Sequence, residues 1–140
     1  MPVLFKHILV PLDFSDKNDA ALETVHGMVS LNSSVVSLLH VVETIGSPED
    51  LEIQKFTQQL QEHSEKELLK RAQRFRDLDI TVTCESRSGN RVQETLAFAA
   101  DNEVDLIVLN SHQMIDNKSS SASISYQIAI LANCPVLLLK

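Results

Sequence analysis

The sequence predicts an α/β protein with an open, parallel sheet of five strands and helices on both faces of the sheet. Short apolar segments rich in Val, Ile and Leu alternate along the chain with longer segments whose apolar residues recur at helical spacing. Parallel strands joined in this way need crossover connections, which are right-handed in nearly all known cases. No repeat or low-complexity tract divides the 140 residues, so we expect a single domain over residues 1–140.

The first half of the chain predicts two buried strands and two helices. Residues 7–12 (HILVPL) form a short apolar strand, and Asp13-Phe14-Ser15-Asp16 then offers side chains that can cap a helix. Apolar residues at helical spacing predict a helix over 18–31. Residues 35–42 (VVSLLHVV) are apolar almost throughout, as in a strand covered on both faces. Residues 49–78 keep one apolar stripe, which predicts a long amphipathic helix.

The second half continues the alternation. Ile80, Val82 and Cys84 alternate with polar residues, the pattern of a partly exposed edge strand, which Ser88-Gly89-Asn90 ends. The remaining predicted elements are, in order, a helix over 92–100, a strand over 104–109, a helix over 124–131 and a strand over 135–139.

Composition and charge argue against several classes of partner. The formal net charge is −7, from 19 acidic and 12 basic residues, whereas binding to nucleic acid needs a positive surface. No apolar run approaches the roughly 20 residues that span a bilayer, and the N-terminus does not have the pattern of a secretion signal. We therefore expect a cytoplasmic protein with no nucleic-acid partner and no membrane partner.

The cysteines and histidines do not have the spacing of a metal site. Cys84 and Cys134 lie in or beside apolar strand-like segments without CxxC spacing, which is typical of two buried thiols. His7 and His40 belong to predicted strands, and the other histidines follow no common spacing. We expect structural histidines and no bound metal.

In an open sheet of this class, ligands bind beyond the carboxyl ends of the strands, where the strand order reverses. Three segments reach those ends: residues 13–15, 41–44 and 110–123. A carboxylate at position 13 could accept a hydrogen bond from a ligand hydroxyl. Asp13 could equally cap the first helix or organise the turn without any ligand.

Several motifs at the strand ends resemble those of the universal stress protein family. They are ILVPLDFS (8–15), LLHVVE (38–43), the pair Ser88-Gly89, DLIVLNSH (105–112) and CPVLLLK (134–140). The chain resembles this family over residues 5–140. The resemblance implies a Rossmann-like fold of the adenine nucleotide alpha hydrolase type, with strand order 3-2-1-4-5.

The resemblance also implies a candidate nucleotide site with a defect. Members that bind ATP carry the pattern G-x-x-G-(nine residues)-G-[Ser/Thr], whose glycines let backbone amides approach phosphates. Here Asn110, Gln113 and Ala122 replace the three glycines, and eight residues instead of nine separate the last two. A side chain at each position would crowd the phosphates, and a required positive φ would be strained.

The candidate site residues, if a nucleotide binds, are those at positions that match family contacts and those at the changed loop. They are Pro11, Leu12, Asp13, Val41, Asn110, Gln113, Ser123 and Ser125.

The preferred hypothesis is a non-enzymatic stress-response protein without a cofactor, which has lost high-affinity ATP binding and acts through protein partners. The apolar last strand would leave an open edge, and family members commonly pair this strand across a two-fold axis, so we expect a homodimer through residues 135–140. The first alternative is an adenine-nucleotide sensor that uses the carboxyl ends of strands 1, 2 and 4.

The second alternative is an enzyme that slowly hydrolyses a phosphate ester or nucleotide, which would need a base, a positioned water and usually a metal, and no residue set here supplies all three. A separate constellation is Ser111 as a nucleophile with His112 as its base, near Asp13 or Asp116. Adjacent residues on a strand point to opposite faces, and the chain has no GxSxG elbow, which argues against catalysis.

Overall fold

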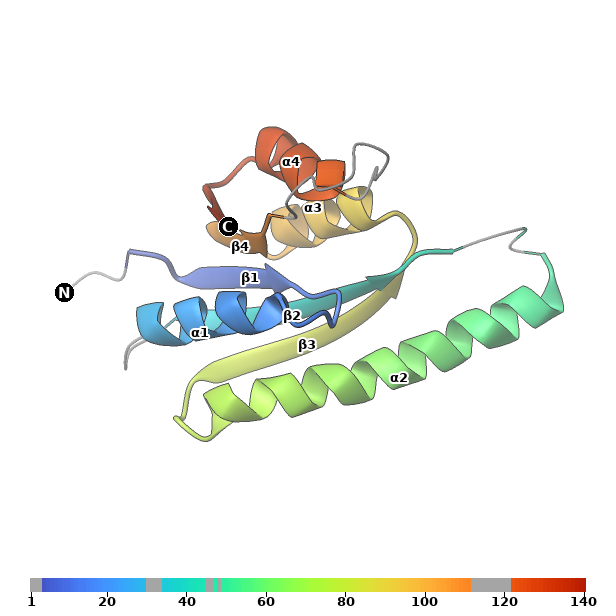
Figure 1. The fold of residues 1–140 in the computed structure, drawn as a ribbon, viewed down its shortest axis with the longest axis horizontal. Helices are drawn as coiled ribbons and strands as arrows, with labels where there is room; N and C mark the ends of the chain where they lie inside the picture. Colours follow the sequence, from blue (N-terminus) through green and yellow to red (C-terminus); the bar gives the residue numbers. More distant parts are fainter. Residues whose placement is uncertain (1–3, 30–33, 45–46, 48, 112–121) are drawn as a thin grey trace.

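The structure is a computed structural model that describes residues 4–29, 34–44, 47, 49–111 and 122–140 (Figure 1). Strands and helices alternate through these residues, as the sequence predicts. The strands are β1 (His7–Pro11), β2 (Val35–Val42), β3 (Thr81–Ser88), β4 (Leu106–Asn110) and β5 (Val136–Leu139). The helices are α1 (Asn18–Met28), α2 (Leu51–Arg76), α3 (Arg91–Asp101) and α4 (Ala122–Leu131).

The strands form one parallel sheet in the order β3-β2-β1-β4-β5. In the register of the central pair, Ile8 lies beside Val36 of β2 and beside Leu106 of β4. The chain therefore winds outward from β1 in both directions, and the strand order reverses between β1 and β4. The predicted fold class and strand order are confirmed.

Each face of the sheet packs against its own pair of helices (Figure 1). Alternate residues of β1 divide between the two cores: Ile8 and Val10 pack with residues of α1 and α2, whereas Leu9 packs with residues of α3 and α4. All three are at most 1% exposed. A strand covered on both faces buries the side chains of successive residues, which explains why β1, β2 and β4 are apolar at most positions.

The ends of several elements differ from the predicted ends for local reasons. Strand β1 ends at Pro11, one residue earlier than predicted, and the Leu12 amide beyond it still donates to the Leu39 carbonyl at 2.8 Å. Helix α2 begins at Leu51, because the Asp50 side chain accepts a hydrogen bond from Glu52 N and caps it. Strand β4 begins at Leu106 and not at residue 104, because the Val104 amide donates back to Ala99 of α3.

The two cysteines are only partly buried, so the prediction of buried thiols is wrong. Cys84 belongs to β3 and Cys134 immediately precedes β5, and these are the two edge strands of the sheet. An edge strand has a neighbour on one side only, so its side chains keep contact with solvent. Burial is still sufficient to raise the pKa of both thiols above the ordinary value of 9.0.

Within the described residues, no helix is both long enough and apolar enough to cross a membrane.

Candidate functional site

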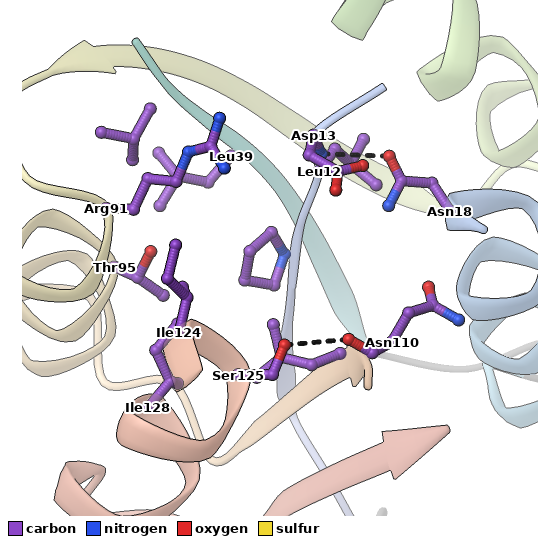
Figure 2. A pocket seen from close by; sticks show the side chains of 13 residues that line it. Leu12, Asp13, Asn18, Leu39, Arg91, Thr95, Asn110, Ile124, Ser125 and Ile128 are labelled. Atoms are coloured by element: carbon purple, nitrogen blue, oxygen red, sulfur yellow. Dashed lines mark hydrogen bonds between the residues drawn. The ribbon is translucent and has the colours of Figure 1, made fainter. Parts of the chain in front are cut away.

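A pocket opens at the carboxyl ends of the central strands, where the strand order reverses (Figure 2). Its cavity volume is about 70 Å³, several times the roughly 10–15 Å³ that one water molecule needs. The lining combines apolar side chains from the strands and α4 with a few polar groups. The lining residues are Pro11, Leu12, Asp13, Asn18, Leu39, Val41, Arg91, Thr95, Leu109, Asn110, Ile124, Ser125 and Ile128.

Six of the eight candidate residues lie around this one pocket, although they come from four separate elements of the fold. They are Pro11, Leu12, Asp13, Val41, Asn110 and Ser125. Gln113 and the side chain of Ser123 lie outside the part of the chain that the structure describes. The structure thus brings the described candidates together, and their contact with a nucleotide stays a prediction.

The turn between β1 and α1 is held by side-chain oxygens. Asn18, which is 5% exposed, accepts hydrogen bonds at Oδ1 from the amides of Asp13 (3.0 Å) and Phe14 (2.7 Å). Asp13 Oδ1 accepts in turn from the Ser15 amide at 2.9 Å. Asp13 therefore organises the turn, whereas the N-cap of α1 is Lys17, which makes no side-chain cap bond. The same Asp13 also lines the pocket, so organising the turn and meeting a ligand are compatible roles.

His40 supports this turn from the opposite face of β2. Its Nδ1 donates to the Leu12 carbonyl at 2.7 Å, so the imidazole is a structural group, as predicted. Burial lowers the pKa of His40 below its ordinary value of 6.5, the bond to Leu12 opposes this shift, and the charge of Arg91 adds to it. Above that ordinary value, His40 is neutral and holds the backbone next to Asp13.

On the α4 side of the pocket, a hydroxyl and a backbone carbonyl satisfy each other. Ser125 is 6% exposed, and its Oγ donates to the Asn110 carbonyl at 2.9 Å (Figure 2). Asn110, which is predicted to stand at the first glycine of the phosphate motif, lies in β4 without a positive φ. Backbone strain at this position is therefore absent, contrary to expectation, and any effect of Asn110 on a ligand comes from its side chain.

The pocket also contains polar residues that the sequence analysis missed, and Arg91 is the one with a charge. It is the first residue of α3, directly after Asn90, whose side chain caps the helix by accepting from Gln93 N at 2.9 Å. Arg91 Nε lies 3.3 Å from Glu43 Oε1. The turn signal at 88–90 gave the position of this helix start. Ser88-Gly89 at the end of β3 is one of the family motifs, but the predicted contacts came from the ends of β1, β2 and β4 and from α4, so Arg91 was not among them.

The serine proposed as a nucleophile is used in the sheet. The Ser111 amide and its Oγ both donate to the Leu139 carbonyl, at 2.7 and 3.0 Å, which extends the pairing of β4 with β5. Its hydroxyl hydrogen is therefore engaged, while His112 and Asp116 lie outside the described residues. The described ranges also contain no group of three or more His, Cys, Asp or Glu side chains placed to hold a metal ion.

Comparison with known proteins agrees with this fold. The Universal stress protein MJ0577 of Methanocaldococcus jannaschii is 26% identical over 159 aligned positions, which cover 100% of this chain and 98% of the relative. The solved structure of MJ0577 superposes with a TM-score of 0.80 over 99% of this chain and 97% of the other.

Two further solved structures share the fold at lower sequence identity. Universal stress protein UspA from Lactobacillus plantarum is 21% identical, with a TM-score of 0.83 over 96% of this chain and 97% of its own. A universal stress protein from Archaeoglobus fulgidus in complex with dAMP is 18% identical, with a TM-score of 0.66 over 98% and 99%. The protein-family model of the Universal stress protein family matches residues 4–140. With a match over nearly its whole length, this chain belongs to the Universal stress protein family.

Proposed function

We propose that this chain is a non-enzymatic universal stress protein that has lost high-affinity ATP binding and acts as a homodimer through protein partners. The observation that carries this proposal is the replacement of all three motif glycines, by Asn110, Gln113 and Ala122. A phosphate chain is normally held by backbone amides that only glycine leaves uncovered. The hydroxyl of Ser125 offers no substitute, because its hydrogen already bonds the Asn110 carbonyl.

The arrangement of α4 and β5 supports a homodimer. Strand β5 pairs only with β4 in the described chain, and Leu137 and Leu138 are 36% and 37% exposed. Tyr126 and Ile130, on the neighbouring helix α4, are 63% and 60% exposed. An apolar strand at an open edge favours pairing with another strand, and a second copy of β5 supplies one.

The proposal that the chain is not an enzyme is supported by the hydrogen bonds that the polar residues near the pocket make. Ser111, which has a histidine beside it in sequence, donates its hydroxyl hydrogen to the Leu139 carbonyl of the sheet. Asp13 is bound to the turn through the Ser15 amide. Hydrolysis of a phosphate ester needs a base, a positioned water and usually a metal. Ser111 is engaged in the sheet, and Asp13, which also lines the pocket, would have to act while it holds the turn.

Native mass spectrometry of the purified protein, followed by analysis of released small molecules, tests this function. We expect a dimer without a bound nucleotide, and no rise in the midpoint of thermal unfolding with 1 mM ATP at equimolar Mg²⁺. A ligand at a hundred times its Kd stabilises the folded state by about 2.7 kcal/mol, so an ATP site with a Kd near 10 μM would be detected. A monomer, or a shift of that size, would contradict the proposal.

A second candidate is a sensor of adenine nucleotides whose adenine and ribose contacts outlast the loss of the phosphate loop. The observation in its favour is that Pro11, Leu12, Asp13 and Val41, the positions matched to those contacts, line one pocket. The A. fulgidus relative is in complex with dAMP, a nucleotide with a single phosphate. Stabilisation by AMP and adenosine, without stabilisation by guanosine, would select this candidate.

A further inference from the structure

The polar groups of the pocket are distributed unevenly around it. In Figure 2, Arg91 and Thr95 of α3 lie on one side, and Asp13 and Asn18 lie across from them. The Asp13 carboxylate only accepts hydrogen bonds when ionised, and the Ser125 hydroxyl has already given its hydrogen to the Asn110 carbonyl. The side-chain amides of Asn18 and Asn110 can also donate, but the positively charged donor of the lining, Arg91, stands on the α3 side.

The other arginines close to this edge of the sheet are engaged elsewhere. Arg87 pairs with Glu85 and with Glu94, and its guanidinium lies 5.2 Å from the centroid of the Phe98 ring. Arg71 pairs with Glu67 of its own helix. Among the pocket-lining residues that the structure describes, Arg91 carries the positive charge.

The position of Arg91 in its helix is unusual for a structural arginine. The first turn of a helix favours anionic side chains, because unpaired backbone N–H groups give that end a positive partial charge. A cation there is slightly unfavourable for α3, but together with the helix end it creates a local field that attracts an anion. A side chain whose charge is unfavourable for its own helix suggests a role other than stabilising the fold.

The ion pair of Arg91 with Glu43 leaves room for a second anion. The two side chains are 38% and 50% exposed, and an exposed pair of this kind contributes little to stability. Glu43 approaches Nε, whereas the guanidinium has five N–H groups in all. An incoming anionic group can therefore share the guanidinium or displace Glu43 from it.

We propose that Arg91 is the anion-binding residue of the pocket, so that an adenine mononucleotide turns its phosphate toward Arg91 and the first turn of α3 and away from α4. This inference deepens the second candidate function and rests on it. The ligand class is a nucleoside carrying one phosphate, with its apolar base among Pro11, Leu39 and Val41 and its hydroxyls toward Asp13. Arg91 thereby takes the part that the missing glycines can no longer play.

Isothermal titration of the protein with adenosine and with AMP, at low ionic strength and without metal, tests the inference. The two probes differ by the phosphate alone. We expect AMP to bind about tenfold more tightly than adenosine, the usual scale of one charge-assisted hydrogen-bonded contact. Arg91→Gln should reduce this ratio to about one, because it removes the charge that distinguishes the two probes. Glu43→Gln should increase the ratio, because it removes the anion that competes for Arg91.

Arg74→Gln, on the last turn of α2, is the matched control, because it removes the same charge from a helix end outside the pocket. It should preserve the wild-type ratio. Equal affinities for AMP and adenosine, or an affinity ratio that is unchanged in Arg91→Gln, would overturn the inference. In either case, binding of adenosine would still support the second candidate function. If neither probe binds, the second candidate and the inference fail together, and the partner-binding function stands apart from both.

Discussion

The ring of Phe14 stacks on the imidazole of His40, with the ring centroids 4.3 Å apart and the planes inclined by 24°. The Arg71 guanidinium also lies over the Phe14 ring, 4.7 Å from its centroid. Phe14 therefore joins the turn after β1 to strand β2 and to helix α2. The contact lies next to Asp13, the carboxylate of the pocket.

Phe14 is also one of the non-glycine residues with a positive φ, at 65°. A side chain in this region costs about 1 kcal/mol or more relative to glycine. The stacking on His40, the cation over the ring and the hydrogen bond from the Phe14 amide to Asn18 offset that cost. The turn that presents Asp13 is thus a strained segment held by contacts with distant residues.

The strain at Phe14 can be measured with two substitutions at that position. Phe14→Ala removes the ring and keeps the strain, whereas Phe14→Gly removes both. We expect both variants to be less stable than the wild type, and Phe14→Ala to be less stable than Phe14→Gly by about 1 kcal/mol in urea unfolding.

Asp16, in the same turn, supplies the control. It is exposed and has no positive φ. Glycine there only adds freedom to the unfolded chain, so Asp16→Gly should be less stable than Asp16→Ala. The same order at both positions would show that the backbone of Phe14 is not strained.

The buried imidazole of His40 makes stability depend on pH. Because burial lowers the pKa of folded His40, the unfolded chain takes up a proton near pH 6.5 while the folded chain does not. The free energy of unfolding should therefore fall as the pH drops below about 6.5, and this loss should end below the folded pKa. The groups that act on His40 by charge are Asp13, Arg91 and His63, and the Arg71 guanidinium lies over the ring stacked on it.

His40→Phe isolates this contribution, because it keeps an aromatic ring beside Phe14 and removes the proton. At pH 7.5 we expect the variant to lose about 1 kcal/mol, since the Leu12 carbonyl loses its donor. The difference in the free energy of unfolding between the variant and the wild type should become smaller from pH 7 to pH 5 in urea titrations. His63→Gln removes the smallest of the charges that act on His40, from a side chain that is 67% exposed, so it should change the wild-type pH profile only slightly. A constant difference at every pH would assign the slope to other groups.

The sequence was sufficient to predict the fold because the apolar pattern follows directly from burial. Strand β2 was predicted at its observed bounds, since all eight residues lie between helices on both faces and leave no polar position except His40 and Ser37. Both of these are hydrogen-bonded, His40 to the Leu12 carbonyl and Ser37 to His7 and Thr83. The partial exposure of Cys84 and Cys134 was missed because the prediction of buried thiols followed the residue type, although the alternation around Cys84 itself indicates an edge strand.

The site was predictable only where a local motif marks it. Asp13 and Val41 follow apolar strands and are found from sequence order. Predicting Arg91 as a site residue would have required the knowledge that the start of α3 lies near the ends of β1 and β4 in space. The positive φ of Phe14 is tolerated because its ring stacks on His40, 26 positions further along the chain. No local sequence pattern predicts this contact.

The exposed apolar side chains of α4 provide a test of the dimer. Ile130→Glu places a charge on a side chain that is 60% exposed in one copy and that a second copy would cover. We expect this variant to sediment as a monomer at concentrations at which the wild type is a dimer, because an unpaired charge is costly to bury. Leu69→Glu is the matched control, since Leu69 of α2 is 51% exposed and lies away from β5. Dissociation by both variants, or by neither, would place the interface elsewhere.

The Asp105 carboxylate fixes the start of the central strand pair. It accepts hydrogen bonds from the amides of Lys6 (2.8 Å) and His7 (2.9 Å), which come from the opposite end of the chain. The Asp105 amide donates to the His7 carbonyl at 3.0 Å, so the two segments are joined by three bonds. Asp105→Ala should cost about 2 kcal/mol in urea unfolding, because two donors lose a charged acceptor.

Asp105→Asn distinguishes the bonds from the bulk of the side chain. The amide keeps one oxygen and the same shape but presents an NH₂ group to the second donor. This variant should therefore recover about half of the stability that Asp105→Ala loses. Hydrogen exchange at the His7 amide gives the local readout, and it should accelerate in both variants relative to the Leu9 amide in the centre of the same strand. Uniform acceleration along β1 would mean that Asp105 acts on global stability alone and does not set the join between β1 and β4.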